Sequence, residues 1–400
     1  MVPRDNDAPL LIDVSRLVWR RWSGTRATGI DRICLAWLEH YGPQSQAVIV
    51  HKHAKAILPE RTSQVLFRLL LRADRSKRDV AQFRRDVIGL GLWQGKYLRD
   101  RLPGRGRLWL NAGHTGLDVE GLEEWCHRRE LRPVYLVHDL IPITHPEFCR
   151  AGEELRHRQR METVSRTAAG VVANSQHTLD EYKAFCQGEN AAVAPAVVAW
   201  PGTPQLPAGR TKVSSDARFV VLGTIEGRKN HLLLLSIWQD LLAQRNQGNS
   251  DWKVPELFIV GRRGWQADAV FEMLDDFDFE GRVHELGPLD DTSLAEVLHG
   301  ARALLFPSLT EGFGIPLVEA LAAGVPVIAS DLPVFREIGQ GTPEFLPPDD
   351  QDAWRSAILD FARPVSARRT HQIERITRFE APSWDEHFKH VDRLITSLSA

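Results

Sequence analysis

The chain has 400 residues, 43% of them apolar and 26% charged, and its formal net charge at pH 7 is −2. Because a single hydrophobic core stops growing below this length, we expect two domains. The composition is typical of a soluble globular protein and argues against extensive disorder. The near-zero net charge excludes a global attraction to nucleic acid or to a membrane, so any such attraction must be local.

The cysteines and the N-terminus bear on the cellular compartment. Four widely scattered cysteines have no metal-ligand spacing: Cys34, Cys126, Cys149 and Cys186. We therefore expect free thiols in a reducing cytoplasm. The N-terminus carries charges where a signal peptide has an apolar run, and no stretch approaches the roughly 20 apolar residues of a membrane span. We expect a cytoplasmic protein that does not span a membrane.

The chain begins as strand, loop and helix. We expect a strand over Leu10–Val14, a long loop with the sequence RRWSGTRATGIDR, and a helix over Ile33–Tyr41. In the loop, Gly29 stands near Arg26 and Arg32, which together could bring backbone N–H groups and positive charge to a phosphate. Such short glycine motifs also occur without a ligand, and no dinucleotide-binding fingerprint is present.

A basic segment runs from Arg68 to Arg107. It contains twelve Lys and Arg residues against four Asp, and its apolar residues suggest one or two amphipathic helices. Two interpretations are open: a solvated helical face with a buried apolar side, or a surface that docks on an acidic membrane or lipid phosphate. Gly89, Gly91 and Gly95 lack the dinucleotide spacing and indicate a break between helices.

Histidines follow two further expected strands at their carboxyl ends. The strand Leu108–Asn111 is followed by His114, and the strand Val134–Val137 is followed by His138 and then by His145. A lone histidine is more often structural than catalytic. Because two strand-end histidines, His138 and His145, would converge on one cleft, we favour a functional role for His138.

The N-terminal half ends in a strand, a helix, another strand and a linker. After the expected strand Gly170–Asn174, Ser175 has the position of an N-cap for a helix over Gln176–Phe185. A further strand over Val193–Trp200 leads into the run GTPQLPAGRTKVSSDA, whose Pro, Gly and Ser content is typical of a linker between domains.

The second half opens with a strand over Phe219–Gly223 and a helix over His231–Gln244. Arg228 and Lys229 stand at the start of this helix, where positive charges oppose the helix dipole. A bound diphosphate would reverse the sign of that effect. We therefore interpret both residues as phosphate ligands rather than surface charges.

Strands and helices continue to alternate downstream. Strands are expected over Leu257–Gly261 and Val283–Leu286, and helices over Ala267–Asp276, from Asp291 or Thr292 to Gly300, over Pro333–Ile338, from Asp350 to Arg363, and in the tail FEAPSWDEHFKHVDRLITSL. Such alternation is typical of α/β domains with a mostly parallel sheet.

The most specific pattern is ALLFPSLTEGFGIPLVEALAAGVPVIAS. We expect a strand over Ala303–Phe306, a loop, a helix with its interior at Leu317–Ala323, and a buried strand over Val325–Ala329. Glu311 lies in the loop. Glu319 lies in the helix and leans back toward the same crevice, because helical side chains tilt toward the N-terminus.

Compensation of the helix dipole, worth roughly 0.3–1 kcal/mol, would explain either carboxylate alone. Gly312 and Gly314 also let the backbone approach a ligand closely, which dipole compensation does not require. The whole arrangement therefore favours a ligand site.

The stretch SLTEGFGIPLVEALAAGVPVIAS resembles the signature of the family 4 retaining glycosyltransferases, in which one Glu is followed after seven residues by another. GTIEGRKNH resembles that family's diphosphate-binding loop, HDLIPITHPEF its acceptor-side loop, and VVANSQHT is also similar. The resemblance implies that Glu311 and its loop contact the donor sugar, that Glu319 holds the ribose hydroxyls, and that the helix N-terminus faces the diphosphate.

The resemblance also implies the remaining site residues. The catalytic candidates are His138, Glu311, Arg228 and Lys229. The donor-binding candidates are Gly29, Gly223, Thr224, Arg228, Lys229, Gly261, Arg262, Leu286, Glu311, Gly312, Phe313, Gly314, Ile315 and Glu319. The acceptor-side candidates are Arg32, His114, Asp139, His145 and Ser175.

The fold implied is α/β, with two Rossmann-like domains facing across a cleft (GT-B). We expect an acceptor-binding domain at 1–200, a linker at 201–217, a nucleotide-sugar-binding domain at 218–378, and a C-terminal helix at 379–400 that crosses back to the N-terminal domain.

The function implied is retaining transfer of a hexose from a nucleotide-diphosphate sugar to a hydroxyl of a growing, lipid-linked surface glycan such as lipopolysaccharide. GDP-mannose is the first candidate donor. No metal or other cofactor is expected, because fixed cations and helix dipoles balance the developing charge. A nucleotide-sugar epimerase or phosphorylase of the same architecture and a non-catalytic donor-binding subunit are alternatives. The expected partners are the donor, a glycan or lipid-linked oligosaccharide acceptor and an anionic inner membrane surface contacted through 68–107, but no nucleic acid.

Overall fold

The structure, a computed structural model, describes residues 9–25, 28–51, 54–72, 77–91, 104–204, 206–207, 216–248 and 253–399. The chain divides into two compact units. Unit 1 consists of Met1–Leu140, Glu154–Pro201 and Trp384–Ala400, and unit 2 consists of Ile141–Glu153 and Gly202–Ser383. The segment Ile141–Glu153, expected in the N-terminal domain, therefore belongs to unit 2. Arg26, Gly95 and most of the expected linker lie outside the described residues.

Unit 1 is built on a seven-stranded sheet with the order β3-β2-β1-β4-β5-β6-β7. The strands are β1 (Leu10–Asp13), β2 (Ser45–His51), β3 (Ala54–Ile57), β4 (Leu108–Asn111), β5 (Arg132–Val137), β6 (Gly170–Ala173) and β7 (Ala196–Val198). All neighbouring strands are parallel except β2 and β3. The central strands are almost fully buried, as is usual for parallel strands with helices on both faces.

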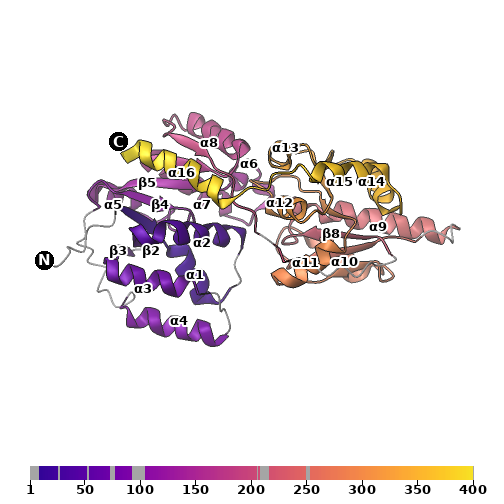
Figure 1. The fold of residues 1–400 in the computed structure, drawn as a ribbon, viewed down its shortest axis with the longest axis horizontal. Coiled ribbons are helices and arrows are strands. Elements are labelled where there is room, and N and C mark those ends of the chain that lie inside the picture. The colour runs from indigo at the N-terminus through magenta and orange to yellow at the C-terminus, as the bar shows by residue number, and fades with distance from the viewer. Residues whose placement is uncertain are drawn as a thin grey trace. The chain divides into compact units, whose positions relative to one another are not determined.

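The helices of unit 1 are drawn in indigo to magenta in Figure 1, except the yellow C-terminal helix. They are α1 (Ser15–Ser23), α2 (Gly29–Tyr41), α3 (Glu60–Leu70), α4 (Lys77–Gly89), α5 (Leu122–Arg128), α7 (Glu153–Thr167), α8 (Gln176–Gly188) and α16 (Trp384–Ser399).

Unit 2 is built on a six-stranded parallel sheet with the order β10-β9-β8-β11-β12-β13. The strands are β8 (Arg218–Leu222), β9 (Glu256–Val260), β10 (Val283–Glu285), β11 (Ala303–Phe306), β12 (Val327–Ser330) and β13 (Glu344–Leu346). The helices are α6 (Ile141–Thr144), α9 (His231–Asn246), α10 (Asp268–Asp276), α11 (Asp291–His299), α12 (Ile315–Ala322), α13 (Pro333–Gly339), α14 (Gln351–Ala362) and α15 (Ala367–Ile376).

Each sheet has one point where the strand order reverses. In unit 1 this switch point lies between β1 and β4, and in unit 2 between β8 and β11. In open α/β sheets, ligands bind at the carboxyl ends of the strands on either side of this point. The loops that follow β1, β4, β8 and β11 are therefore where the fold places a ligand site.

The last helix, α16, belongs to unit 1, so the expected return of the C-terminal helix to the N-terminal domain is confirmed. Trp37 in α2 donates from its indole nitrogen to His387 Nε2 at 2.9 Å. The Tyr41 hydroxyl donates to Asp392 at 2.8 Å. Phe388 is buried in the same core cluster as Trp37. These contacts hold α16, near the C-terminus, against α2 in the N-terminal part of the chain.

The prediction of a long loop after the first strand is wrong, because α1 occupies the first part of that segment. Leu17 and Val18 are buried in the core, and Arg21 forms an ion pair with Asp79 in α4 at 2.6 Å. The helix ends at Gly24, whose φ of 67° lies in the left-handed region that glycine adopts readily. Buried contacts along one face thus stabilise α1. The arginines and the glycine in this segment do not predict a helix.

Other elements were placed incorrectly or missed. The helix expected from Ile33 begins at Gly29, where Thr28 and Asp31 form a capping box. The edge strand β3 and its neighbour β2 were not predicted. The helix expected to begin with an Asp291 or Thr292 cap has Asp290 as its N-cap, whose carboxylate accepts from the Ser293 N–H. Other boundaries differ by a few residues.

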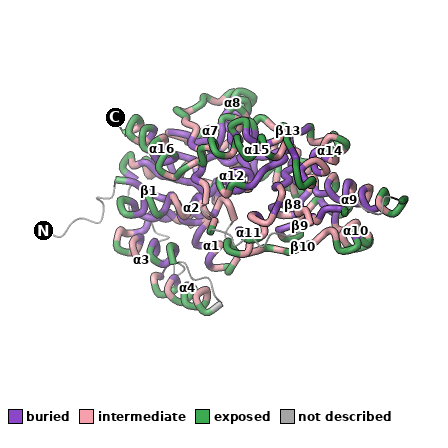
Figure 2. Tube along the Cα trace, turned by 45° about the vertical axis from the view of Figure 1, so that its right-hand side comes forward, coloured by how far each residue is buried: buried purple, intermediate pink, exposed green. Residues whose placement is uncertain are grey.

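The expected amphipathic helix in the basic segment is confirmed as α4. Phe83 and Val87 are buried, whereas Arg78, Arg84 and Arg85 are exposed, and Figure 2 colours most of this helix as exposed or intermediate. In the parts of the chain that the structure describes, no helix is long and apolar enough to cross a membrane.

Candidate active site

The loops after β8 and β11 bring four charged side chains together in unit 2. Arg228 lies 2.6 Å from one carboxylate oxygen of Glu311 and 2.7 Å from Glu226. Lys229 contacts the other Glu311 oxygen, which also accepts from the Ser308 hydroxyl at 2.9 Å. We call Glu226, Arg228, Lys229 and Glu311 the ionic cluster.

The ionic cluster is neutral and almost closed to solvent. Burial would raise the pKa of Glu311, but the charges and hydrogen bonds of Arg228 and Lys229 outweigh it and lower the pKa to about 2. For Glu226 burial prevails and raises the pKa, and for Lys229 burial prevails and lowers it. The sequence argument treated Arg228 and Lys229 as uncompensated cations. The prediction that these charges lack counter-ions is wrong, because the carboxylates of Glu226 and Glu311 balance them.

Two helix N-termini face the same end of the sheet as the ionic cluster. α9 follows β8 and α12 follows β11, and neither has a side-chain cap or an acidic residue in its first turn. Their N-cap residues, Asn230 and Gly314, have φ of 55° and 113°. Because the first N–H groups of a helix lack intrahelical partners and carry partial positive charge, such ends attract anions.

The expected donor loop is buried from Glu311 to Gly314, and Ile315 is half-buried. At Gly314 an added Cβ would lie 2.8 Å from the Phe335 ring, so this position requires glycine for space as well as for its positive φ. Phe313 is buried, and Glu319 is buried in α12. The structure therefore places both expected carboxylates in the loop and helix after β11.

The remaining donor-binding candidates of unit 2 follow β8, β9 and β10, on the side of the switch point away from β11. Gly223, at the end of β8, and Gly261, at the end of β9, are so close that a Cβ on Gly261 would lie 1.8 Å from the Gly223 carbonyl oxygen. Thr224 is half-buried, Arg262 is exposed and Leu286 is 38% exposed. The strand order puts Arg262 and Leu286 one and two strands away from β8.

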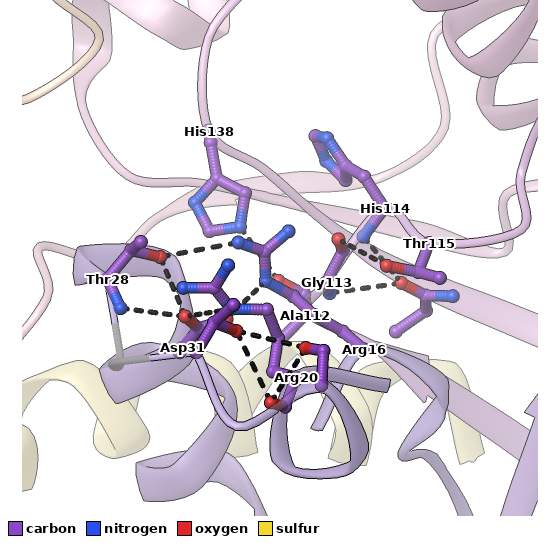
Figure 3. Close-up of polar contacts among 12 residues, drawn as sticks. Arg16, Arg20, Thr28, Asp31, Ala112, Gly113, His114, Thr115 and His138 are labelled. Carbon is purple, nitrogen blue, oxygen red and sulfur yellow. Dashed lines mark hydrogen bonds and ion pairs between the residues drawn. The ribbon is translucent and has the colours of Figure 1, made fainter. Parts of the chain in front are cut away.

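In unit 1, an ion-paired group follows β1 (Figure 3). Asp31 accepts from Arg16 Nε at 2.7 Å, from Arg20 Nε at 2.9 Å and from the Thr28 N–H at 2.7 Å. Burial would raise the pKa of Asp31, but Arg16, Thr28 and Arg20 outweigh it and lower the pKa. Gly29 is the first residue of α2 and lies between the two capping-box residues Thr28 and Asp31, and Arg32 is half-buried in the same turn.

Three histidines lie together beyond β4 and β5. The ring centroids of His114 and His138 are 5.0 Å apart, and those of His114 and His157 are 6.0 Å apart. His138 donates from Nε2 to the Ala112 carbonyl at 2.7 Å, and His114 donates from Nε2 to the Leu136 carbonyl at 2.6 Å. Burial lowers the pKa of His138 to about 4 and that of His114 well below its ordinary value. Both rings are therefore neutral near pH 7, and each keeps Nδ1 to accept a hydrogen bond.

The remaining acceptor-side candidates are placed differently. The Asp139 carbonyl accepts from His157 Nε2 at 3.1 Å. Ser175 accepts from the Thr178 N–H at 3.0 Å, which confirms its position as the N-cap of α8. His145 belongs to unit 2, is partly exposed, and lies 3.3 Å from Glu147. Within unit 1 the structure thus groups His138 with His114 and His157.

Sequence reasoning missed several contacts. In unit 2 it assigned no role to Glu226 or Ser308, and in unit 1 none to Arg16, Asp31 or His157. One signal was available, since Thr28 and Asp31 have the three-residue spacing of a capping box. Arg16 finds its partner Asp31 in the next helix, and Arg228 finds Glu311 in another loop, so no local pattern shows these pairs. Within the described ranges no group of three or more His, Cys, Asp or Glu is placed to hold a metal ion.

Residues 216–363 match the family model described as glycosyl transferases group 1. The matched segment runs from β8 through α14 of unit 2. The chain is 30% identical over 226 residues to a serotype-specific mannosyltransferase WbdA of Escherichia coli, which covers 52% of this chain and 27% of that protein. It is 39% identical over 102 residues to the O-antigen chain mannosyltransferase RfbU of Salmonella typhimurium, covering 26% of this chain and 29% of that protein. The alignments thus span under a third of each relative.

Solved structures resemble the whole chain. Anabaena HepE in complex with UDP-glucose has a TM-score of 0.61 at 15% identity, covering 98% of both chains. Sucrose-phosphate synthase from Thermosynechococcus elongatus has a TM-score of 0.58 at 17% identity, covering 98% of this chain and 99% of that one. These likenesses show the fold. The chain has the expected fold of two α/β units, each built on a mostly parallel sheet.

Proposed function

We propose that the protein is a retaining glycosyltransferase that moves a hexose from a nucleotide-diphosphate sugar to a hydroxyl of a growing, lipid-linked surface glycan. The observation that carries this proposal is the ionic cluster beside two uncapped helix N-termini, at the switch point of a group 1 glycosyltransferase domain. The names of WbdA and RfbU support mannose as the first candidate sugar. The UDP-glucose complex of HepE supports a nucleotide sugar as the donor class.

The ionic cluster would bind the diphosphate without a metal ion. The Arg228 side chain is 21% exposed, whereas that of Lys229 is 9% exposed. We therefore expect phosphate oxygens to replace a carboxylate on Arg228 first, with Lys229 remaining beside Glu311. As the nucleoside diphosphate leaves, negative charge develops on its phosphate. Fixed cations and helix N-termini stabilise that charge and lower the barrier.

The transfer step follows from this arrangement. The acceptor oxygen forms a bond to the anomeric carbon on the face from which the phosphate departs, so the configuration is retained. The carbon–oxygen bond to the phosphate breaks, and the leaving phosphate takes the proton of the acceptor hydroxyl. Glu311 and its loop would contact the sugar, and Glu319 would bind the ribose hydroxyls. His138 is neutral, and its Nδ1 would accept a hydrogen bond from a sugar hydroxyl.

The exposed arginines of α4 would hold the enzyme on an anionic inner membrane surface, since each cation near such a surface contributes on the order of 1 kcal/mol. Sedimentation with anionic vesicles should show binding that salt releases. Changing Arg78 and Arg85 to Ala should weaken it. Equal binding to neutral vesicles, or none at low salt, would remove this part of the proposal.

The proposed activity is tested by screening nucleotide sugars for thermal stabilisation, beginning with GDP-mannose, and then assaying transfer to a glycan acceptor. NMR of the product's anomeric proton should show the configuration of the donor. Incubation without acceptor identifies an epimerase by its altered sugar, and incubation with phosphate identifies a phosphorylase. Nucleotide binding with no turnover under any condition would leave a donor-binding subunit and refute the proposed transfer.

A further inference from the structure

We propose that unit 1 has a second ligand site, a pocket whose arginines bind the phosphate group of a small soluble molecule. The pocket has a volume of about 510 Å³ and lies where β1, β4 and β5 begin, between the end of α2 and the second half of α16. Parallel strands all begin at the same edge of their sheet. This edge is opposite to the one that carries Asp31 and His138, so the pocket is separate from the site described above.

The pocket, which we call the arginine pocket, has an excess of positive charge. Arg105, Arg107 and Arg132 line it together with a single carboxylate, that of Asp392. Asp392 accepts from the Tyr41 hydroxyl at 2.8 Å. Among the described residues, the side chains of Arg105 and Arg132 have no ion-pair or hydrogen-bond partner. Two guanidinium groups at the pocket are therefore not paired with any side chain of the described residues.

The turns that carry these arginines are tied together. The Gly106 N–H donates to the Glu130 carbonyl at 2.8 Å, and the Arg132 N–H donates to the Arg107 carbonyl at 3.0 Å. Arg105 has a φ of 51°, in the left-handed region that a residue with a Cβ rarely adopts. The backbone thus keeps a strained turn that directs successive arginines to one pocket, and such strain often accompanies a binding role.

One arginine is already fixed in position. Arg107 donates from Nε to the Gly104 carbonyl at 3.0 Å and contacts the Gln46 side chain. A fixed guanidinium loses less conformational entropy when it binds a ligand than a free surface side chain does. The arginine pocket therefore combines one positioned guanidinium with two that can close on an anion.

The chemistry of the lining identifies the class of ligand. Guanidinium groups bind phosphate through paired hydrogen bonds, and the volume is in the range of small-molecule sites. Tyr41, Leu10 and Leu108 are buried and supply an apolar wall. We therefore expect a phosphate ester with a small organic body. Because Ile395 and Asp392 come from α16, a bound ligand would also strengthen the contact of α16 with the strand ends.

Calorimetry with inorganic phosphate and with glucose 6-phosphate tests the inference. The wild-type chain should bind glucose 6-phosphate, and the double variant Arg105→Ala/Arg132→Ala should bind it at least about tenfold more weakly, as expected for the loss of charge-assisted hydrogen bonds. Arg128→Ala is the matched control, since Arg128 is exposed at the end of α5 and does not line the pocket. Phosphate bound at the ionic cluster would be retained in all three proteins.

A second double variant controls for the possibility that the Ala variant binds weakly only because it does not fold. Arg105→Lys/Arg132→Lys keeps the charge but removes the forked donors, and it should bind with an affinity between those of the wild type and the Ala variant. Absence of any wild-type binding, or equal binding by the double Ala variant, would overturn the site.

Vesicles separate a lipid headgroup from a soluble phosphate. Binding to phosphatidylglycerol vesicles should be the same for the wild type and the double Ala variant. Vesicle binding that the double Ala variant loses, and that glucose 6-phosphate does not compete for, would assign the anion to a lipid and overturn the soluble source.

Discussion

The two switch points of the molecule are built with different chemistry. In unit 2 the loops after β8 and β11 hold a neutral set of four charged side chains, and only Arg228 among them is appreciably exposed. In unit 1 the loop after β4 and the neighbouring loop after β5 hold neutral imidazoles, and the ion pairs around Asp31 lie on the other side of the switch point, after β1. Burying a charge is unfavourable unless it is paired, so the buried charges of both units have counter-ions, whereas the buried imidazoles of unit 1 stay neutral.

The difference matches the ligands we propose for the two sites. A diphosphate is bound by cations that remain charged, and burial lowers the pKa of Lys229. Glu311 opposes that shift because it lies against the ammonium group. Sugar hydroxyls need hydrogen-bond donors and acceptors without net charge, which neutral His138 can provide. Glu311 therefore has a positioning role in unit 2 in addition to the sugar contact we propose.

The largest effect should come from removing both cations. Arg228→Ala/Lys229→Ala should lower kcat/KM for transfer by about 10²–10⁴-fold, because each charge-assisted contact is worth roughly 1.5–3 kcal/mol. Lys253→Ala is the control, since Lys253 is an exposed cation of unit 2 paired with Asp216. Steady-state assays with and without EDTA complete the test. If EDTA abolishes transfer and magnesium or manganese restores it, the metal-independent scheme is wrong.

The second-largest effect is a pH-dependent change in the free energy of unfolding when Glu311 is replaced. Because Glu311 has its pKa lowered from 4.5 to about 2, its ion pairs contribute stability above pH 4.5 that is lost as the pH falls toward 2. The pKa difference corresponds to about 3 kcal/mol. Urea unfolding should therefore show wild type more stable than Glu311→Gln by roughly this amount at pH 7, and the gap should close toward pH 2. A gap that does not change with pH would refute the ionic role of Glu311.

A smaller effect, on the affinity for the nucleoside diphosphate, should distinguish Glu311 from Glu319. Glu319→Ala should weaken binding of the free nucleoside diphosphate by about 1–3 kcal/mol, because it strands hydroxyls that the carboxylate would bind. Glu311→Gln should weaken that binding less, because diphosphate oxygens can take its place beside Arg228, and it should chiefly slow transfer. Calorimetry and transfer rates on both variants decide this. The opposite ranking would reverse the orientation of the donor that we propose.

The sequence predicted the fold of unit 2 more fully than that of unit 1. Strands β8, β11 and β12 are nearly continuous apolar runs, and glycines and prolines mark the helix after β11, so contiguous patterns were enough. The helix α1 was missed because its buried face includes Arg21, whose charge is paired by Asp79, far away in the sequence. Edge strands such as β3 are short, and only pairing with β2 defines them.

The candidate sites show the same limit. Positions of Glu311 and Glu319 followed from local spacing, but the balance of Arg228 by Glu226 and Glu311 depends on two loops meeting. The grouping of His138 with His114 and His157 likewise depends on neighbouring strands and on α7. Sequence patterns therefore placed side chains at strand ends, whereas their charge states required the partners that only the fold brings together.

The smallest effect concerns the neutral site of unit 1. Because burial lowers the pKa of His138 from 6.5 to about 4, its contribution to stability is present above pH 6.5 and is lost as the pH falls toward 4. From pH 7 to pH 5 this amounts to about 1–2 kcal/mol. Wild type should lose that much more stability than His138→Gln over this interval, as urea unfolding would measure.

The variant His387→Gln is a control that separates the effect of a buried histidine on stability from an effect on the transfer rate. His387 is also buried, with its pKa lowered to about 4, but it lies on α16 where it contacts Trp37 of α2, and it donates to the Ala199 and Trp200 carbonyls. Both variants should reduce the pH slope of stability. Only His138→Gln should slow transfer, and the wild-type transfer rate should show no limb from this imidazole between pH 5 and pH 8, because the ring is already neutral there. A transfer rate that falls equally in both variants would mean that His138 acts through stability alone, and the functional contrast between the two switch points would be lost.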